Sequence, residues 1–393
     1  MGLAERIVAR LGELTGASGF VEITRAHVDG CLYHGQASLD FAERLMAEGA
    51  RVSVPTTLNV GSLDLLHPER YRGGPETRER AKRLMDAYVA LGCRPTWTCA
   101  PYQLSARPEL GEQIAWAESN AIVFANSVLG ARTNRYGDFV DVAAAIVGRV
   151  PDTGLHRNEG RRGEIVFRLD GVPERLLADD VLYPVLGYLV GHEAGALVPV
   201  LVGLPVETGE DRLKALGAAA ASSGSVALFH AVGVTPEAST LEDALHGLPP
   251  ARTVEVTPAL LRRARDSLTT TEDGRLGAVS LGTPHASVAE LERIAALLGE
   301  LPRPRVPVYV STSRDVLARA PALPGVEVVV DTCTYVTPIL GRLDGAVMTD
   351  SAKWAYYAPG NLGVEVVFGS LEECLRSAAA GGVRRVPELW ADA

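Results

Sequence analysis

The composition of the chain is that of a folded protein with a sizeable hydrophobic core. It has 393 residues, of which 47% are hydrophobic and 22% charged, so disorder is excluded for most of its length. The net charge of −10 argues against a nucleic-acid-binding face and against an anionic membrane as a partner. Five cysteines are too few for a disulfide framework, and we expect a reducing cytoplasm. No uninterrupted apolar run approaches the ~20 residues of a membrane helix.

The first half of the chain alternates short apolar runs with helical patterns. Leu3, Ile7, Leu11 and Leu14 share one helical face, which predicts an amphipathic helix at the start. In the run 197–204 both the odd-numbered and the even-numbered positions are mainly apolar, as in a strand covered on both faces. The predicted elements are, in chain order, helix 3–14, strands 21–24 and 51–57, helices 76–91 and 112–120, and strands 121–124 and 197–204.

The second half shows clearer helix starts. Thr257 precedes Pro258 as an N-cap before a first-turn proline. Ser287 and Glu290 have the spacing of a capping box. Strands that alternate with helices predict an α/β fold with parallel sheets covered on both faces. The predicted strands are 226–232, 277–281, 306–310, 326–330, 346–349 and 364–368, with helices over 258–268 and 288–299.

Turn-rich segments near 151–163 and 204–211 suggest how the chain divides. We expect a first α/β region over 1–150, which holds the TTLN, TCAPY and GARTN loops. A connecting α/β segment would follow over 151–210. A second α/β region over 211–393 would hold the GTPH, DTC and TDSAKW loops.

Polar and ionisable residues follow nearly every predicted strand. In open α/β sheets ligands bind beyond the carboxyl ends of the strands, so these positions predict a site built from several loops. Each residue also has a purely structural interpretation: single histidines such as His34 and His285 commonly bond to nearby backbone, and Arg132 could be a surface charge. No Walker loop, GxGxxG fingerprint, zinc signature or nucleophile elbow is present. Spacing alone therefore predicts a multi-loop α/β enzyme and no particular reaction.

Several long strings in the sequence resemble one family, aconitase X, over residues 5–385. These strings are AHVDGCLYHGQASLDFAERL (26–45), VPTTLNVGSLDLLHP (54–68), TCAPYQL (98–104), AWAESNAIVFANSVLGARTNRYGDF (115–139), VGVTPEA (232–238), VVDTCTYVTP (329–338) and TDSAKWAYYAPG (349–360). The resemblance implies an aconitase-like fold of several parallel-sheet α/β/α layers, here without the small swivelling domain. It therefore also implies a separate small subunit, and so a heterodimer.

The resemblance implies a hydro-lyase that removes water from a small hydroxy acid. The activity it favours is dehydration of cis-3-hydroxy-L-proline to Δ1-pyrroline-2-carboxylate, because no second cluster of cations that could hold a phosphate is evident beside Arg132 and Arg135. The alternatives are the large subunit of a mevalonate 5-phosphate dehydratase, a metal-independent lyase or isomerase, and a non-catalytic subunit that binds a small ligand.

The resemblance also implies an iron–sulfur cluster, with Cys99 and Cys333 as ligands. The family's third cysteine falls where this chain has Thr283, in the string Gly282-Thr283-Pro284-His285. Soft thiolates suit iron, whereas a threonine hydroxyl does not. Three interpretations stay open: Thr283 or His285 completes an unusual cluster site, a single metal ion binds Cys99, His285 and Cys333, or no metal binds.

Roles for the remaining residues follow from the chemistry of dehydration. A cation must stabilise charge that develops toward the substrate carboxylate, and Lys353 is the main candidate. His34 and Glu118 are the other candidate catalytic residues. The Arg132 guanidinium can donate two hydrogen bonds to one carboxylate. The candidate substrate-binding residues are Thr56, Thr57, Asn59, Ser119, Asn120, Asn126, Arg132, Thr133, Asn134 and Ser351.

Overall fold

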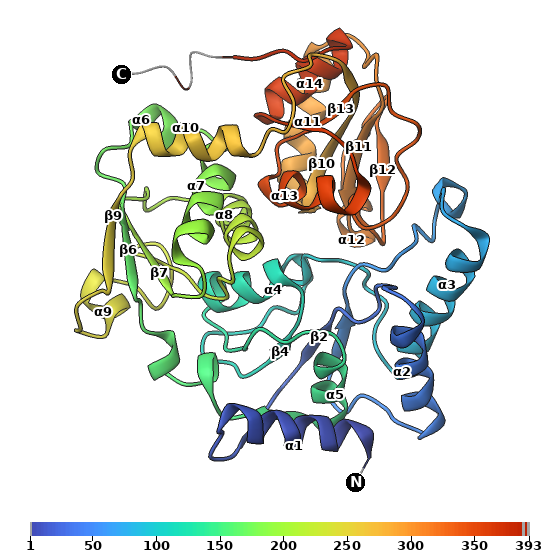
Figure 1. The fold of residues 1–393 in the computed structure, drawn as a ribbon, viewed down its shortest axis with the longest axis vertical. Coiled ribbons are helices and arrows are strands. Elements are labelled where there is room, and N and C mark those ends of the chain that lie inside the picture. Colours follow the sequence, from blue (N-terminus) through green and yellow to red (C-terminus); the bar gives the residue numbers. More distant parts are fainter. Residues whose placement is uncertain (1, 387–389, 391–393) are drawn as a thin grey trace.

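Three parallel sheets organise the chain, one after another along the sequence (Figure 1). The computed structural model describes residues 2–386 and Trp390. Each sheet carries its own helices, and the three α/β regions pack around a common centre. This arrangement confirms the α/β class with parallel sheets that the sequence predicted.

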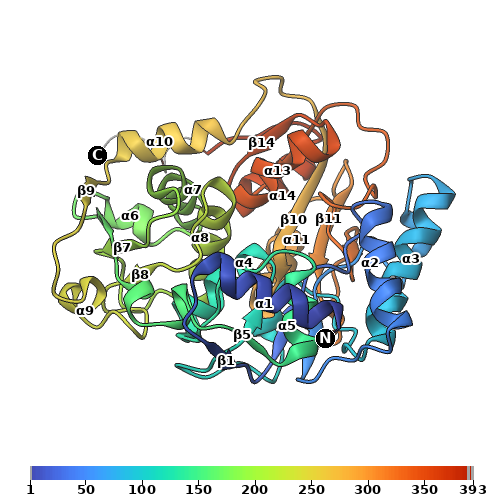
Figure 2. The same ribbon diagram turned by 60° about the horizontal axis from the view of Figure 1, so that its bottom comes forward.

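The first region is built on a three-stranded parallel sheet of order β3-β2-β4. Its apolar face packs on α2 and α3 in one cluster of buried side chains. A short antiparallel pair, β1 with β5, lies beside α1, and Figure 2 shows this pair next to α5. The elements are α1 (Leu3–Thr15), β1 (Phe20–Glu22), β2 (Ala26–Val28), α2 (Gln36–Ala47), β3 (Thr56–Leu58), α3 (Pro75–Ala90), β4 (Ala115–Trp116), α4 (Ser119–Phe124), α5 (Val140–Val147) and β5 (Arg149–Pro151).

The second region has a four-stranded parallel sheet of order β8-β7-β6-β9. Helices α7 and α8 pack closely because Gly187 and Gly191 face the backbone of α8, where any side chain would strike a carbonyl oxygen. The boundary expected at 210/211 falls inside this sheet, since the turn-rich segment 204–211 joins a strand to a helix. The elements are β6 (Ile165–Arg168), α6 (Glu174–Leu177), α7 (Leu182–Ala194), β7 (Pro199–Val202), α8 (Glu210–Ser223), β8 (His230–Ala231), α9 (Leu241–Leu245), β9 (Arg252–Glu255) and α10 (Pro258–Ser267).

The third region has a five-stranded parallel sheet of order β12-β11-β10-β13-β14. The predicted capping box is confirmed at the start of α11, where the Ser287 hydroxyl accepts the Glu290 N–H and the Glu290 carboxylate accepts the Ser287 N–H. The elements are β10 (Leu276–Ala286), α11 (Val288–Glu300), β11 (Val308–Thr312), α12 (Arg314–Leu317), β12 (Glu327–Val329), β13 (Ala346–Thr349), α13 (Ala352–Leu362), β14 (Val366–Phe368) and α14 (Leu371–Ala380).

Two predictions for the first region are wrong. The predicted helix 112–120 contains β4, and the predicted strand 121–124 is the body of α4. A short apolar run fits either state, and here the Glu118 carboxylate accepts the Ala121 N–H and starts a helix. The predicted strand 21–24 overlaps β1, whereas the central strand β2 was not predicted. No helix among the described residues is long and apolar enough to cross a membrane.

Candidate functional site

The sheet of the first region delivers polar side chains to one edge. On neighbouring strands, His27 Nδ1 lies 2.8 Å from Thr57 Oγ1, and the His27 ring lies 5.8 Å from the Trp116 ring. Side chains alternate across a strand, so the residues two positions further on continue the same face. Those residues are Asp29, Asn59 and Glu118, at the carboxyl ends of β2, β3 and β4, where ligands bind in parallel sheets.

Glu118 forms a buried ion pair with Lys353, a residue 235 positions away in the first turn of α13. The two side chains are 6% and 3% exposed. Glu118 has a left-handed backbone (φ 72°), which directs its carboxylate back over the start of α4. The carboxylate also accepts the Ala121 N–H at 2.9 Å and the Asn120 amide, and Lys353 Nζ donates to Ser119 Oγ at 3.2 Å.

The electrostatics of this pair keep both groups charged. Burial alone would raise the pKa of Glu118, but the Lys353 charge and its hydrogen bond hold that pKa below the usual value. Burial likewise disfavours the charged amine, yet the Glu118 carboxylate raises the pKa of Lys353 well above its usual value. Lys353 is therefore a fixed cation and hydrogen-bond donor, and it has no role as a base at neutral pH.

Cys99, His285 and Cys333 meet in the interior, although they come from three separate segments. Their ligand atoms lie within 4.8 Å of one another and all three residues are buried. His285 Nε2 faces the Thr332 carbonyl oxygen at 3.2 Å, so that nitrogen carries the proton. His285 Nδ1, 3.1 Å from Thr98 Oγ1, then keeps its lone pair, and burial lowers the pKa of the ring to about 4.

These three residues fit a metal centre. Two sulfurs and a neutral imidazole are donors that iron and zinc accept. A hydrogen bond to Cys99 and burial raise the pKa of the Cys333 thiol well above its usual value, so metal binding would release its proton. Thr283 offers only a hydroxyl, and its buried Oγ1 has no partner among the described residues. The set would supply three ligands to a metal ion or cluster.

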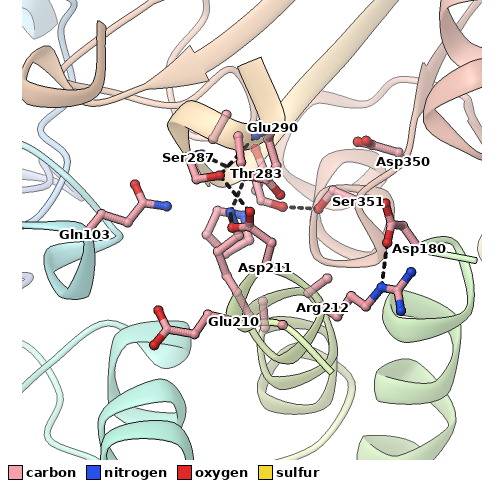
Figure 3. Close-up of a pocket in the computed structure, with 18 of the residues that line it drawn as sticks. Gln103, Asp180, Glu210, Asp211, Arg212, Thr283, Ser287, Glu290, Asp350 and Ser351 are labelled. Carbon is pink, nitrogen blue, oxygen red and sulfur yellow. Dashed lines mark hydrogen bonds and ion pairs between the residues drawn. The ribbon is translucent and has the colours of Figure 1, made fainter. Parts of the chain in front are cut away.

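A cavity of about 830 Å³ opens between the second and third regions, with Thr283 and, from the first region, Gln103 on its wall (Figure 3). Lys353 also lines it. Ser351 lies on its wall, donating to the Thr283 carbonyl oxygen and capping α13. Lys214 is buried on the opposite wall between Glu290 and Asp211, whose Oδ1 lies 3.1 Å from Nζ. The cavity thus connects the Glu118–Lys353 pair with the junction of the two regions.

The structure brings together part of the predicted site. Glu118, Ser119, Asn120 and Lys353 form one hydrogen-bonded group, and Asn120 Nδ2 also donates to the Cys99 carbonyl oxygen at 2.7 Å. This bond ties the ion pair to the candidate metal centre. From the sequence, Glu118, Ser119 and Asn120 were candidates just before a predicted strand, and Lys353 was a separate candidate.

The other predicted residues lie outside this group, and most of them bond to neighbouring backbone. His34 is exposed on a loop, and Thr56 Oγ1 donates to the Val54 carbonyl oxygen at 2.8 Å. A further group, in the segment 126–134, holds neighbouring backbone in place. Asn126 bonds to Thr133, Ala227 and Arg161; Arg132 to His156 and Asn158; Thr133 to Trp116; and Asn134 to Thr153 and Leu155.

Asp29 was missed as a candidate, although it lies in the string that carries the resemblance. Its carboxylate accepts a hydrogen bond from the Asn59 amide, and its side chain stays partly exposed. Burial and the charge of Glu118 raise its pKa to about 8. The signal that could have found it is its place directly after β2, but that strand was not predicted.

Three family models match successive parts of the chain. They are the aconitase X first domain over residues 2–159, the second domain over 163–266 and the third domain over 276–380. These spans coincide with the three sheets. Their junctions lie near residues 160 and 270, one of them close to the turn-rich segment 151–163.

Curated relatives of the chain are dehydratases. It is 43% identical to cis-3-hydroxy-L-proline dehydratase of Pseudomonas aeruginosa, over 96% of this chain and 67% of that protein. The same enzyme of Hypocrea jecorina is 42% identical, over 96% and 65%. The phosphomevalonate dehydratase large subunit of Methanothermobacter thermautotrophicus is 38% identical, over 94% and 92%. The chain thus spans about two thirds of the hydroxyproline enzymes and nearly all of the archaeal large subunit.

A solved structure confirms the expected aconitase-like architecture. The holo-form of aconitase X from Thermococcus kodakarensis superposes with a TM-score of 0.84 at 34% sequence identity, over 95% of this chain and 94% of that one. Fold, family models and relatives agree over nearly the whole length. The chain belongs to the aconitase X family.

Proposed function

We propose that this chain is the large, metal-holding subunit of a hydro-lyase that converts cis-3-hydroxy-L-proline to Δ1-pyrroline-2-carboxylate. The observation that carries the proposal is the buried Cys99–His285–Cys333 set beside the Glu118–Lys353 ion pair. A dehydratase needs a group that assists departure of hydroxide and a fixed cation near the substrate's charge, and this site provides for both.

The substrate is proposed from similarity and from charge. The hydroxyproline dehydratases are 43% and 42% identical to this chain, whereas the phosphomevalonate dehydratase large subunit of Methanothermobacter thermautotrophicus is 38% identical. The strand ends of the first region carry carboxylates rather than clustered cations. An amino acid with a cationic ring nitrogen suits such a site better than a phosphorylated acid.

Iron is the metal we propose, and when bound it supplies a Lewis acid for cleavage of the carbon–oxygen bond. Cys99, Cys333 and His285 would hold it. Lys353 Nζ keeps its proton and places a positive charge at the site, while Ser119 and Asn120 orient the pair. Lys353 cannot remove the substrate proton because its amine stays charged, so we assign the base to a small swivelling subunit.

The form of the iron separates the interpretations that the sequence left open. Anaerobic purification with the small subunit, followed by iron and acid-labile sulfide analysis, distinguishes them. Iron with matching sulfide indicates a cluster despite Thr283, and iron without sulfide indicates a single ion. The absence of both iron and sulfide would refute the iron mechanism and favour a metal-independent lyase or isomerase. Thr283→Cys, which adds a third thiol, is expected to raise sulfide retention if a cluster forms.

Turnover tests the function itself. The complex is expected to form Δ1-pyrroline-2-carboxylate from cis-3-hydroxy-L-proline and to leave mevalonate 5-phosphate unchanged. The reverse preference would assign the chain to the phosphomevalonate dehydratases, and turnover of neither would support a non-catalytic subunit. All five cysteines are free thiols in the structure, which supports the proposed cytoplasmic location.

A further inference from the structure

The carboxyl edge of the first sheet holds more negative than positive charge. Asp29, Asp138 and Asp141 gather there beside Glu118, and the charge of each of the other three raises the pKa of Asp29. Lys353, which reaches this edge from the third region, is already paired with Glu118. His34, on an exposed loop, only partly offsets the burial that raises the pKa of Asp138. The edge therefore attracts a cation and repels an anion.

Asn59 supplies a second observation that points to a ligand. Its side chain is 2% exposed, and Nδ2 donates to Asp29 Oδ1. Its carbonyl oxygen Oδ1 is buried and has no hydrogen-bond donor among the described residues. A buried acceptor without a donor is costly. A ligand that brings an N–H to this oxygen would remove that cost.

Hydrogen bonds fix the backbone around Asp29. The carboxylate of the fully buried Asp141 accepts the Asp29 N–H at 2.7 Å and the Gly30 N–H at 3.1 Å. Position 30 must be glycine because a side chain would strike the Tyr88 hydroxyl. Asp141 thus acts as a positioning residue, and the partly exposed Asp29 carboxylate faces a fixed direction.

We propose that the Asp29 carboxylate and the Asn59 Oδ1 atom together bind the ring ammonium of the substrate. A secondary ammonium carries two N–H bonds, and the pair offers one anionic and one neutral acceptor. This inference rests on the function proposed above and deepens it: it names Asp29 as the residue that selects a cyclic amino acid. A phosphorylated hydroxy acid has no cationic group to pair with the Asp29 carboxylate, and its negative charge is repelled.

The location agrees with a small substrate. Asp29 is close enough to Glu118 for that charge to raise its pKa, and Glu118 in turn lies beside Lys353. Asn120 links this pair to the candidate metal centre, because its Nδ2 donates to both the Glu118 carboxylate and the Cys99 carbonyl oxygen. Val60, the residue after Asn59, packs with Cys99 and Cys333 in one buried cluster, so the proposed ammonium receptor lies next to the candidate metal centre.

The test measures binding of two matched probes to the chain in complex with its small subunit and iron. L-proline carries the ring ammonium, and cyclopentanecarboxylate has the same ring size and carboxylate without it. At about pH 9, where the Asp29 carboxylate is ionised and proline keeps its ammonium, the wild-type protein is expected to bind proline more tightly. Asp29→Asn keeps the side-chain shape and is expected to weaken proline binding about 30-fold or more while leaving cyclopentanecarboxylate unchanged. Asp86→Asn, which removes an exposed charge on α3, is the control and should change neither.

A pH series on the wild-type protein gives a second measurement that does not depend on the variant folding. Glu118, Asp138, Asp141 and Cys31 face Asp29 from the surrounding elements. The pKa of Asp29 is about 8, so its carboxylate ionises as the pH rises through 8. Proline affinity is expected to rise over that interval, and cyclopentanecarboxylate affinity is expected to lack this rise.

The outcomes separate this inference from the proposed function. Equal weakening of both probes by Asp29→Asn, no weakening of either, or no wild-type preference for proline would overturn the ammonium receptor, even if hydroxyproline is dehydrated. Asp29-dependent proline binding without any turnover of cis-3-hydroxy-L-proline would support the receptor and refute the proposed reaction.

Discussion

Two polar segments of the first region differ in what their side chains bind. In the segment 126–134, side chains such as Asn126 and Asn134 bond mainly to backbone groups of neighbouring loops. At the carboxyl edge of the sheet, Glu118 bonds to Lys353 from another region, and Asn59 leaves an acceptor unpaired. A polar residue that makes all its hydrogen bonds to backbone groups stabilises the fold. Buried charges and buried atoms without a hydrogen-bond partner indicate a functional site.

The metal ligands should show the largest effect of any substitution at the site. Cys99→Ser replaces a thiolate ligand with a hydroxyl, and we expect loss of bound iron and about a 1000-fold or greater loss of turnover. Iron analysis and kcat measurement check this. Cys374→Ser, at a buried thiol in α14, is the matched control and should retain its iron. Full iron content in the Cys99→Ser protein would remove Cys99 from the ligand set.

Removing the cation of the buried ion pair should affect both stability and activity. Lys353→Met leaves Glu118 buried without its partner, and we expect a loss of about 3 kcal/mol in the free energy of unfolding together with loss of most turnover. Urea denaturation and kcat report the two effects. Lys82→Met, at an exposed ion pair with Asp86, should change the free energy of unfolding by less than about 1 kcal/mol.

The double variant Glu118→Gln with Lys353→Met separates the two roles of the pair. It removes both charges, so most of the stability should return while turnover stays low. Recovery of turnover together with stability would show that the pair only supports the fold. The contrast between the two segments would then disappear.

The segment 126–134 should behave in the opposite way. Asn126→Ala removes bonds to Thr133, Ala227 and Arg161, and we expect a loss of about 2 kcal/mol in the free energy of unfolding. We expect kcat/KM to stay within about threefold at temperatures where the variant is folded. Asn361→Ala, at an exposed position, is the control. A large fall in kcat/KM for Asn126→Ala at full folding would place this segment in the site.

A buried histidine beside this segment should make stability depend on pH. His156 lies 2.6 Å from both Tyr136 Oη and Gln113 Oε1, and burial lowers its pKa to about 4. Below pH 6.5 the unfolded chain binds a proton at this residue and the folded chain does not, until about pH 4. Stability should therefore fall with decreasing pH, by about 1.4 kcal/mol per unit from this residue. Denaturation curves of His156→Gln measured across this pH range should show a free energy of unfolding whose dependence on pH is smaller by about one proton.

Local signals predicted much of the secondary structure. The N-caps at Thr257 and Ser287 lie where the sequence placed them, because a side-chain hydroxyl bonding to a backbone N–H two or three residues on is a local interaction. The short strands were harder. Residues 121–124 became a helix because Glu118 caps it from the preceding loop, and β2 was missed because a three-residue strand has almost no period.

The sequence by itself determined the class of fold, the family, and the identity of the candidate ligands Cys99, His285 and Cys333, since composition, local capping and long specific strings are properties of the chain. Only the tertiary structure decided which residues share a site. Lys353 meets Glu118 across 235 positions, and Asp29 lies beside Asn59, because the order of strands in a parallel sheet sets these contacts. Whether a polar side chain braces backbone or stays available depends on partners that are distant in sequence, and no local pattern records them.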